Sequence, residues 1–408
     1  MKISINHFTV VIATILGAIY AFTLFEPSFI LGRSVYWTEP FGDRITNLIG
    51  ALYFAHDDWR FPLFYVPGLG FPEGANIVYT DSLPLLALVA KVIFKMTGEW
   101  VNYFGLWLFA CFPLLAFFIA LATKEGGAKD VVSVLGATFL ALASPALLIR
   151  FGHAALMAHF LIAWSFYLYL KLIRSTDSRA VIAQFCIVAA LSVVLQAYFL
   201  MMVLPFLLAA LAQVVMLGRV TLRNAIASFI AVIGVILATA WIAGIIGSGS
   251  MPADAWGFGH YSMNVLSPFL PPREWLPENI ARHITWDGNG YSWDATGGQY
   301  EGYNYLGAGM LLLLIVHLST SRDLVKKALK RHVFLVLVLT VLLLFALSNR
   351  VFVGDWLVFD IPMFPFLRII TDHFRTGGRL FWPIYYVLTV ALVLLTYQRF
   401  NPRIAKAL

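Results

Sequence analysis

The sequence predicts an all-α, polytopic membrane protein with about ten transmembrane helices and periplasmic juxtamembrane helices. Hydrophobic residues make up 61% of the chain and charged residues only 12%, which is far from the composition of soluble globular proteins. Several runs of about 20 apolar residues match the length needed to cross the hydrocarbon core of a bilayer. We therefore expect residues 1–408 to form a single integral domain in the lipid bilayer, rather than a string of soluble domains.

The first apolar run follows Lys2, is long and has no clear small-x-small cleavage site, so it is interpreted as an uncleaved first span and not as a signal peptide. A piece at 83–96 has only about 14 residues and contains Lys91 and Lys95, which makes it short for a crossing. Ten other segments are predicted to cross the membrane, at about 8–29, 101–122, 131–149, 154–172, 180–198, 200–217, 223–247, 304–319, 333–348 and 381–398.

The basic residues are distributed unevenly between the two predicted faces. If 83–96 stays outside the membrane core, one face contains both termini and the loops KEGGAKD, KLIRSTDSR, LGRVTLRN and SRDLVKKALKRH, with 16 of the 28 Lys and Arg residues. Basic loops face the cytoplasm as a rule, so both termini are predicted to be cytoplasmic and 83–96 to be an interfacial amphipathic helix. The same bias explains the net charge of +7, so no nucleic-acid partner is expected.

This orientation places the long polar loops on the outer, periplasmic face. They are the first loop, 30–100, the large loop 248–303 and the loop 349–380, with a short turn at 150–153. The large loop is too rich in aromatic residues for a disordered linker, and its tryptophans are Trp256, Trp275, Trp286 and Trp293. No internal repeat of the kind found in many transporters is visible.

Two aspartates in the first loop are candidates for chemistry. Asp43, in FGDRITN, lies in the first turn of a predicted helix, where a carboxylate either stabilises the helix start or acts as a general base toward an incoming hydroxyl. Asp81, in YTDSLP, precedes the helix that starts near Pro84, and is either a cap or a catalytic partner. Carboxylates of this loop could also hold a divalent cation. The two cysteines, Cys111 and Cys186, lie in predicted spans and provide neither a disulfide framework nor a metal site.

Three basic or titratable residues lie where the third predicted span ends and the fourth begins. Arg150 and His153 are near the membrane boundary, where charged groups tend to be functional, and they are candidates for binding a phosphate. His159 lies deeper, and is either a core group or a substrate contact.

The segment HFRTGGRLFWP precedes the last predicted span. Arg375 and Arg379 lie four residues apart across a Gly-Gly pair, and arginine suits bidentate phosphate contacts. Glycines allow backbone N–H groups to approach an anion. The alternative is that both arginines extend from the membrane edge to water.

The segment EGYNYLGAG opens the eighth predicted span. Close helix packing is the leading interpretation for Gly307 and Gly309. Glu301, Tyr303 and Tyr305 are candidates for lining a sugar site.

Taken in order, the motifs GD, YTDS, GH-x-x-L-x-x-H, EGYNYLG and FR-x-GGRLFWP resemble those of the GT-C superfamily of polytopic glycosyltransferases, and look most similar to a bacterial branch of it. That superfamily includes the bacterial aminoarabinose transferases and the protein O-mannosyltransferases, and uses polyprenyl-phosphate-linked sugar donors. The resemblance implies a long first outer loop with an essential acid soon after span one, which here is Asp43, and a second large outer loop, which here is 248–303.

The resemblance implies an inverting glycosyltransferase in a bacterial inner membrane. We expect transfer of a sugar from a polyprenyl-phosphate-linked donor to a cell-envelope glycan, lipid or protein acceptor at the periplasmic face, with Asp43 as general base. Arg375 and Arg379, with Arg150 or His153, would stabilise the departing lipid phosphate. Asp81 and Glu301 would assist.

Two alternatives come from other functional classes. A lipid-linked saccharide flippase or transporter would place functional charges near the middle of the membrane, yet the predicted spans are nearly free of carboxylates. An assembly factor without chemistry would tolerate replacement of Asp43 and of the two arginines.

Overall fold

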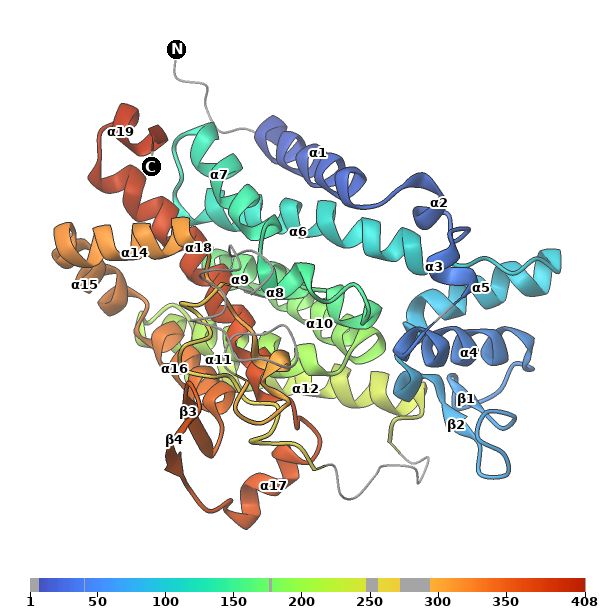
Figure 1. Ribbon diagram of the computed structural model, residues 1–408. Coiled ribbons are helices and arrows are strands. Elements are labelled where there is room, and N and C mark those ends of the chain that lie inside the picture. Colours follow the sequence, from blue (N-terminus) through green and yellow to red (C-terminus); the bar gives the residue numbers. More distant parts are fainter. Residues whose placement is uncertain (1–6, 40, 176–177, 247–255, 272–293, 408) are drawn as a thin grey trace. The chain divides into compact units, whose positions relative to one another are not determined.

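The computed structural model describes residues 7–39, 41–175, 178–246, 256–271 and 294–407, and most of them are helical (Figure 1). The chain forms two compact units. Unit 1 comprises residues 1–142 and 149–251, and unit 2 comprises residues 143–148 and 252–408.

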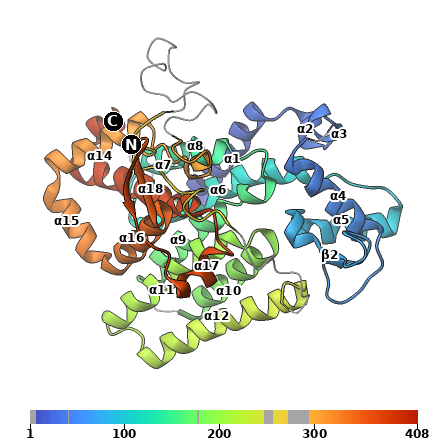
Figure 2. The ribbon, with the colours of Figure 1, turned by 60° about the horizontal axis from the view of Figure 1, so that its bottom comes forward.

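The core of unit 1 is built around α6, which packs against α1, α7 and α9, while α10, α11 and α12 lie side by side (Figure 2). At Gly17 of α1 a Cβ atom would lie 2.7 Å from Ala116 Cβ, so α1 and α6 approach closely because this residue has no side chain. The long helices of the unit are α1 (His7–Leu24), α6 (Phe104–Gly126), α7 (Val131–Leu142), α9 (Phe160–Leu172), α10 (Ser178–Leu195), α11 (Tyr198–Met216) and α12 (Leu222–Ala243).

The first outer loop of the prediction is a folded subassembly in unit 1. It comprises α2 (Pro27–Ile30), α3 (Val35–Thr38), α4 (Asp43–His56), the short antiparallel pair β1 (Tyr65–Val66) and β2 (Ala75–Asn76), η1 (Ile77–Thr80) and α5 (Pro84–Thr97). Two of these elements, α4 and α5, pack against each other.

The lysines of α5 explain how this helix is held. Lys91 is 1% exposed; its Nζ donates to the Asp58 carbonyl at 3.0 Å and lies 4.1 Å from the centre of the Phe54 ring. Lys95 Nζ donates to the His56 carbonyl at 3.3 Å. Both lysines therefore fasten α5 to the end of α4 and the residues after it. With 14 residues, α5 is not among the helices long enough to cross a membrane.

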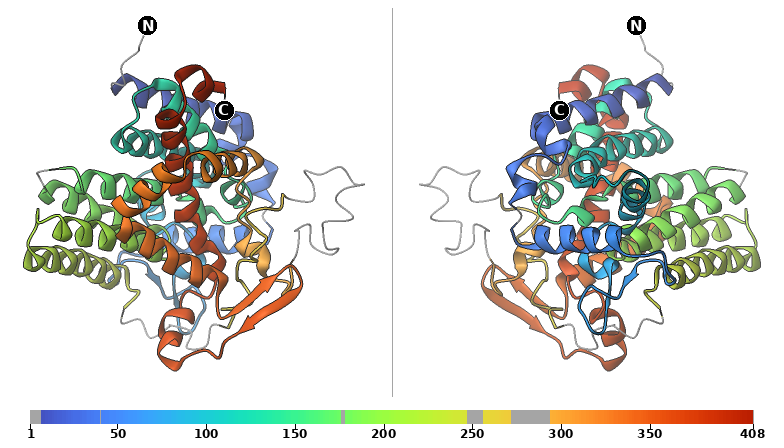
Figure 3. Two further views of the ribbon diagram at one scale, coloured as in Figure 1. Left: turned by 90° about the vertical axis from the view of Figure 1, so that its left-hand side faces the viewer. Right: turned by 90° about the vertical axis from the view of Figure 1, so that its right-hand side faces the viewer.

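Unit 2 contains a second group of helices and a β-hairpin. Its α14 packs on α18, and α16 packs on η5. The antiparallel strands β3 (Arg350–Val353) and β4 (Trp356–Asp360) form the hairpin, visible as two arrows in Figure 3. The helices are α8 (Pro145–Leu148), η4 (Gln299–Gly302), α14 (Ala308–Thr320), α15 (Arg322–Arg331), α16 (Val333–Leu347), α17 (Pro365–Thr371), η5 (Gly377–Phe381), α18 (Trp382–Arg399) and α19 (Pro402–Ala407).

The chain is a multi-pass membrane protein by the length and composition of its helices. Among the described residues seven helices are long and apolar enough to cross a membrane, or eight if α14 and α15, which meet at a bend of 101°, count as one span. The apolar helices α7 and α16 are shorter, with 12 and 15 residues. Each of the ten segments predicted to cross the membrane overlaps a helix. Because α7 and α16 are shorter than a membrane-spanning helix, they are two of the predicted spans that the count by length leaves out.

Candidate functional site

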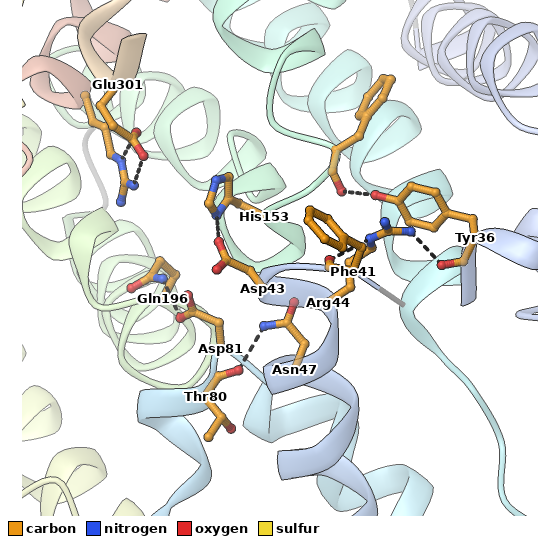
Figure 4. A network of polar contacts seen from close by, with 12 residues as sticks. Tyr36, Phe41, Asp43, Arg44, Asn47, Thr80, Asp81, His153, Gln196 and Glu301 are labelled. Carbon is orange, nitrogen blue, oxygen red and sulfur yellow. Dashed lines mark hydrogen bonds and ion pairs between the residues drawn. The ribbon is translucent and has the colours of Figure 1, made fainter. Parts of the chain in front are cut away.

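The Asp43 carboxylate is paired with His153 in unit 1. Asp43 Oδ2 lies 2.8 Å from His153 Nδ1, and the two side chains are 62% and 31% exposed (Figure 4). Asp43 is the first residue of α4, but the N-cap position is Gly42 and makes no side-chain capping bond. His153 precedes η2 (Ala154–Met157). The structure therefore joins the predicted base with a predicted phosphate ligand in one solvent-accessible pair.

Arg44 and Tyr36 hold this pair in place. Arg44 Nη1 donates to the Tyr36 carbonyl at 2.7 Å, and its guanidinium lies 3.8 Å from the centre of the Tyr36 ring. The Tyr36 hydroxyl donates in turn to the Phe151 carbonyl at 3.3 Å, two residues before His153. Burial raises the pKa of Tyr36, an effect that Arg44 opposes only in part, so the hydroxyl keeps the proton that it donates. These contacts link the start of α4 to the segment that carries His153.

The segment that carries Asp81 packs against α4 one turn after Asp43, at Asn47. The Asn47 side-chain amide donates to the Thr80 carbonyl at 2.8 Å, and the Ser82 hydroxyl donates to the Asn47 carbonyl at 2.7 Å. At Gly50 a Cβ atom would lie 2.1 Å from Thr80 Oγ1, so the segment around Asp81 rests directly on α4 because Gly50 has no side chain. Both aspartates of the prediction are thus held by the same helix.

Asp81 is not the N-cap of α5, which was one of its two predicted roles. The N-cap of α5 is Leu83, whereas Asp81 follows η1 with a left-handed backbone (φ 51°). Its Oδ1 accepts a hydrogen bond from Gln196 Nε2 at 2.8 Å, from the connection between α10 and α11. Gln196 is not among the candidates predicted from the sequence, because no local pattern marks a residue 115 positions away as a partner of Asp81.

An open apolar groove of about 530 Å³ runs beside α4 in the same unit. Its volume lies within the range of small-molecule sites, roughly 300–1,000 Å³. The apolar residues Ile45, Leu48, Ile49 and Leu52, whose helical spacing predicts the helix after Asp43, form one wall. The lining residues are Gly32, Trp37, Thr38, Ile45, Leu48, Ile49, Leu52, Trp100 and Asn102.

Arg150 and His159 are buried in unit 1. His159 is fully buried, with its ring 6.2 Å from that of Phe199, which favours the core interpretation over a substrate contact. Arg150 is 2% exposed, so a phosphate could reach it only through a rearrangement of the surrounding chain.

Glu301 and Arg379 form a buried, bidentate ion pair in unit 2. Arg379 Nε lies 3.0 Å from Glu301 Oε2, and Nη2 lies 3.0 Å from Oε1. Beside the pair, a Cβ atom at Gly378 would lie 2.3 Å from the Gly302 Cα, and the Asn304 amide donates to both glycine carbonyls at 2.9 Å. The EGYN and TGGR motifs therefore form one buried polar cluster.

The two arginines of the predicted phosphate clamp have different surroundings. Arg379 is buried and is held by Glu301, whereas Arg375 is exposed, with its guanidinium 5.7 Å from the centre of the Tyr261 ring. Of the two, Arg375 is the one that presents its guanidinium to solvent. The two arginines lie four residues apart but do not share a helix face, because η5 begins between them, at Gly377.

Tyr303 and Tyr305 are both buried. The Tyr303 hydroxyl donates to the Leu270 carbonyl at 3.3 Å, and Tyr305 is 7% exposed. The prediction of close helix packing at Gly307 and Gly309 is wrong for the part of the chain that the structure describes, because a Cβ atom at either position would meet no atom of it within 4 Å. Gly307 has a left-handed backbone (φ 89°) just before α14, and that conformation is what favours glycine there.

Part of the predicted large loop lies outside the described residues, including Trp275, Trp286 and Trp293. Within the described ranges no three His, Cys, Asp or Glu side chains converge as a metal site would require. Cys111 and Cys186 are free thiols.

No curated protein and no solved structure matches the chain. A family model described as a domain of unknown function, DUF6311, matches residues 14–408, from within α1 to the end of the chain. Since that match covers nearly the whole chain, including every element that carries the polar pairs described above, the protein belongs to the DUF6311 family.

Proposed function

We propose that the protein is an inverting glycosyltransferase of the GT-C type. It transfers a sugar from a polyprenyl-phosphate-linked donor to a cell-envelope glycan, lipid or protein at the periplasmic face of a bacterial inner membrane, with both termini in the cytoplasm. The observation that carries the proposal is the solvent-accessible Asp43–His153 pair at the start of α4, with Asp81 held one turn further along.

In this mechanism Asp43 accepts the proton of the acceptor hydroxyl. The acceptor oxygen forms a bond to the anomeric carbon, and the bond from that carbon to the lipid phosphate breaks, with its electron pair leaving on the phosphate oxygen. Such general-base assistance accelerates a reaction by roughly 10²–10⁴-fold. His153 orients the carboxylate through its 2.8 Å contact with Asp43.

The groove beside α4 supports a lipid-linked substrate. Its wall begins at Ile45, two residues after Asp43, and its lining is predominantly apolar. An isoprenoid chain is apolar along its whole length, which matches this lining. In this proposal Arg375, with its exposed guanidinium, binds the lipid phosphate, and Arg379 acts through Glu301 as a positioning residue.

A transfer assay with the full-length protein in lipid nanodiscs tests the proposal. The donor would be undecaprenyl phosphate carrying a radiolabelled hexose or aminoarabinose, the acceptor a total cell-envelope extract, and the readout released undecaprenyl phosphate. Asp43→Asn should lower the rate by at least 100-fold. Asp58→Asn, an exposed aspartate of the same loop, is the matched control and should leave the rate unchanged.

Two results would contradict the assignment. Transfer by Asp43→Asn at the wild-type rate removes Asp43 from the base role. Movement of the labelled lipid across the membrane without any release of undecaprenyl phosphate, over all donors tested, would favour the flippase alternative.

A further inference from the structure

A tight turn in unit 2, WGFGHY at residues 256–261, displays aromatic rings to solvent. The backbone N–H groups of His260 and Tyr261 both donate to the Gly257 carbonyl, at 3.0 and 2.9 Å. Gly257 and Gly259 have left-handed backbones, with φ of 136° and 93°. A Cβ atom at Gly257 would lie 2.7 Å from the Tyr261 ring, so this turn can form only because the position is glycine.

Four rings gather at this turn. The Trp256 and His260 rings lie 4.8 Å apart, edge to face, and the Trp256 and Tyr261 rings lie 6.2 Å apart, nearly parallel. The Tyr300 ring meets that of Tyr261 at 6.4 Å. Trp256 is 68% exposed and the other three rings are half-buried, so the cluster is not part of a core.

Residues of the segments 296–298 and 377–379 hold the turn in place. The Thr296 hydroxyl donates to the His260 carbonyl at 2.6 Å, and a Cβ atom at Gly298 would lie 2.4 Å from the His260 ring. The Gly378 N–H donates to the Tyr261 carbonyl at 3.0 Å, and the next residue is Arg379 of the buried ion pair. This support keeps the exposed rings in a fixed arrangement before any ligand arrives, which lowers the ordering cost of binding.

The side chain of Arg375 adds a positive charge beside the aromatic rings. The exposed guanidinium of Arg375 lies 5.7 Å from the centre of the Tyr261 ring, and its Cδ would be 3.4 Å from a Cβ at Gly257. No carboxylate among the described residues is paired with it. A rigid aromatic surface with an adjacent, available guanidinium is an arrangement that packing alone does not require.

We propose that Trp256, His260, Tyr261 and Arg375 form a binding site for a phosphorylated saccharide. The faces of aromatic rings are electrically negative and attract the weakly positive C–H groups of a pyranose, while the planar guanidinium binds phosphate through paired hydrogen bonds. The site rests on the proposed function for the choice of ligand, and it deepens that function by assigning the recognition of the sugar phosphate to unit 2.

Direct binding tests the site without relying on catalysis. The full-length protein in nanodiscs of neutral phosphatidylcholine would be titrated with glucose 1-phosphate, followed by saturation-transfer NMR, with glucose and inorganic phosphate as separate probes. Undecaprenyl-phosphate-glucose in the same nanodiscs distinguishes a lipid-linked source of the ligand from a soluble one. The Asp43→Asn variant should bind like the wild type.

The variants separate the two kinds of contact. Trp256→Ala and Tyr261→Ala should each weaken glucose 1-phosphate binding at least roughly tenfold, and Tyr261→Phe should retain it. Arg375→Gln should abolish the preference for glucose 1-phosphate over glucose. Trp356→Ala, which removes a tryptophan that is 79% exposed on the hairpin of the same unit, is the matched control and should have no effect.

Three outcomes would overturn the site: no binding of any probe by the wild type, equal loss in the Trp356→Ala control, or normal binding by Trp256→Ala. The third outcome, with weakened retention of that variant in nanodiscs, would identify the rings as anchors at the membrane–water interface instead. Binding without any transfer activity would refute the proposed function and leave the site intact.

Discussion

Replacing Glu301 by glutamine should destabilise unit 2 strongly. The side chain keeps its shape but loses its charge, so the buried guanidinium of Arg379, 8% exposed, loses the carboxylate that it contacts through two atoms. Removing one partner of a buried ion pair costs about 3–5 kcal/mol. The short contacts in the pair, both 3.0 Å, place it in this class rather than among surface pairs.

The thermal unfolding midpoint of the protein in detergent is the readout. For a unit of this size 1 kcal/mol corresponds to about 2–4 °C, so Glu301→Gln should lower the midpoint by at least roughly 6 °C. Replacing both partners by apolar residues, as Glu301→Leu with Arg379→Met, should restore most of the loss, since no buried charge then remains.

The exposed pair Arg350–Asp360 of the same unit is the matched control. Its atoms lie 3.7 Å apart and the side chains are about half exposed, so Asp360→Asn should cost at most about 1 kcal/mol. The reasoning fails if Glu301→Gln shifts the midpoint no more than this control does. It also fails if the double variant is as unstable as the two single losses added together.

Two further predictions concern unit 1. Gly50→Ala should lower the yield of folded protein, because a Cβ atom there would overlap Thr80 Oγ1 at 2.1 Å. The control Gly136→Ala should be neutral, since a Cβ atom there meets no atom of the described residues within 4 Å. Equal yields of the two variants would show that the segment around Asp81 is not held tightly on α4. Burial lowers the pKa of Lys91 from its usual 10.5, which Asp57 only partly offsets, so the unfolded chain binds more protons than the folded one just below pH 10.5. The stability of the wild type relative to Lys91→Met should therefore rise as the pH increases toward 10.5 in equilibrium unfolding experiments, and a falling difference would contradict the burial of this amine.

The helical membrane class followed from the sequence because its causes are local. The length of an apolar run decides whether a helix reaches across a bilayer, and every residue of the run contributes. The same reasoning identified 83–96 as too short to cross, and the structure contains a 14-residue helix there. Asp43 was placed in a first helical turn by the stripe of apolar residues that follows it, and α4 begins at that residue.

The predictions about individual contacts depended on segments far apart in the chain. Arg375 and Arg379 share a motif, yet Glu301, 78 residues before Arg379, binds one of them and leaves the other exposed. The small residues Gly307 and Gly309 suggested close packing, which requires a neighbour that the sequence does not specify.

The sequence by itself determined that this chain is a helical membrane protein, where α4 begins in its first long loop, and which polar residues to compare with the structure. Only the tertiary structure decided that Asp43 pairs with His153, Asp81 with Gln196 and Arg379 with Glu301. The physical reason is one of range. Helix periodicity and hydropathy depend on neighbours within a few turns, whereas an ion pair depends on how entire helices pack against one another.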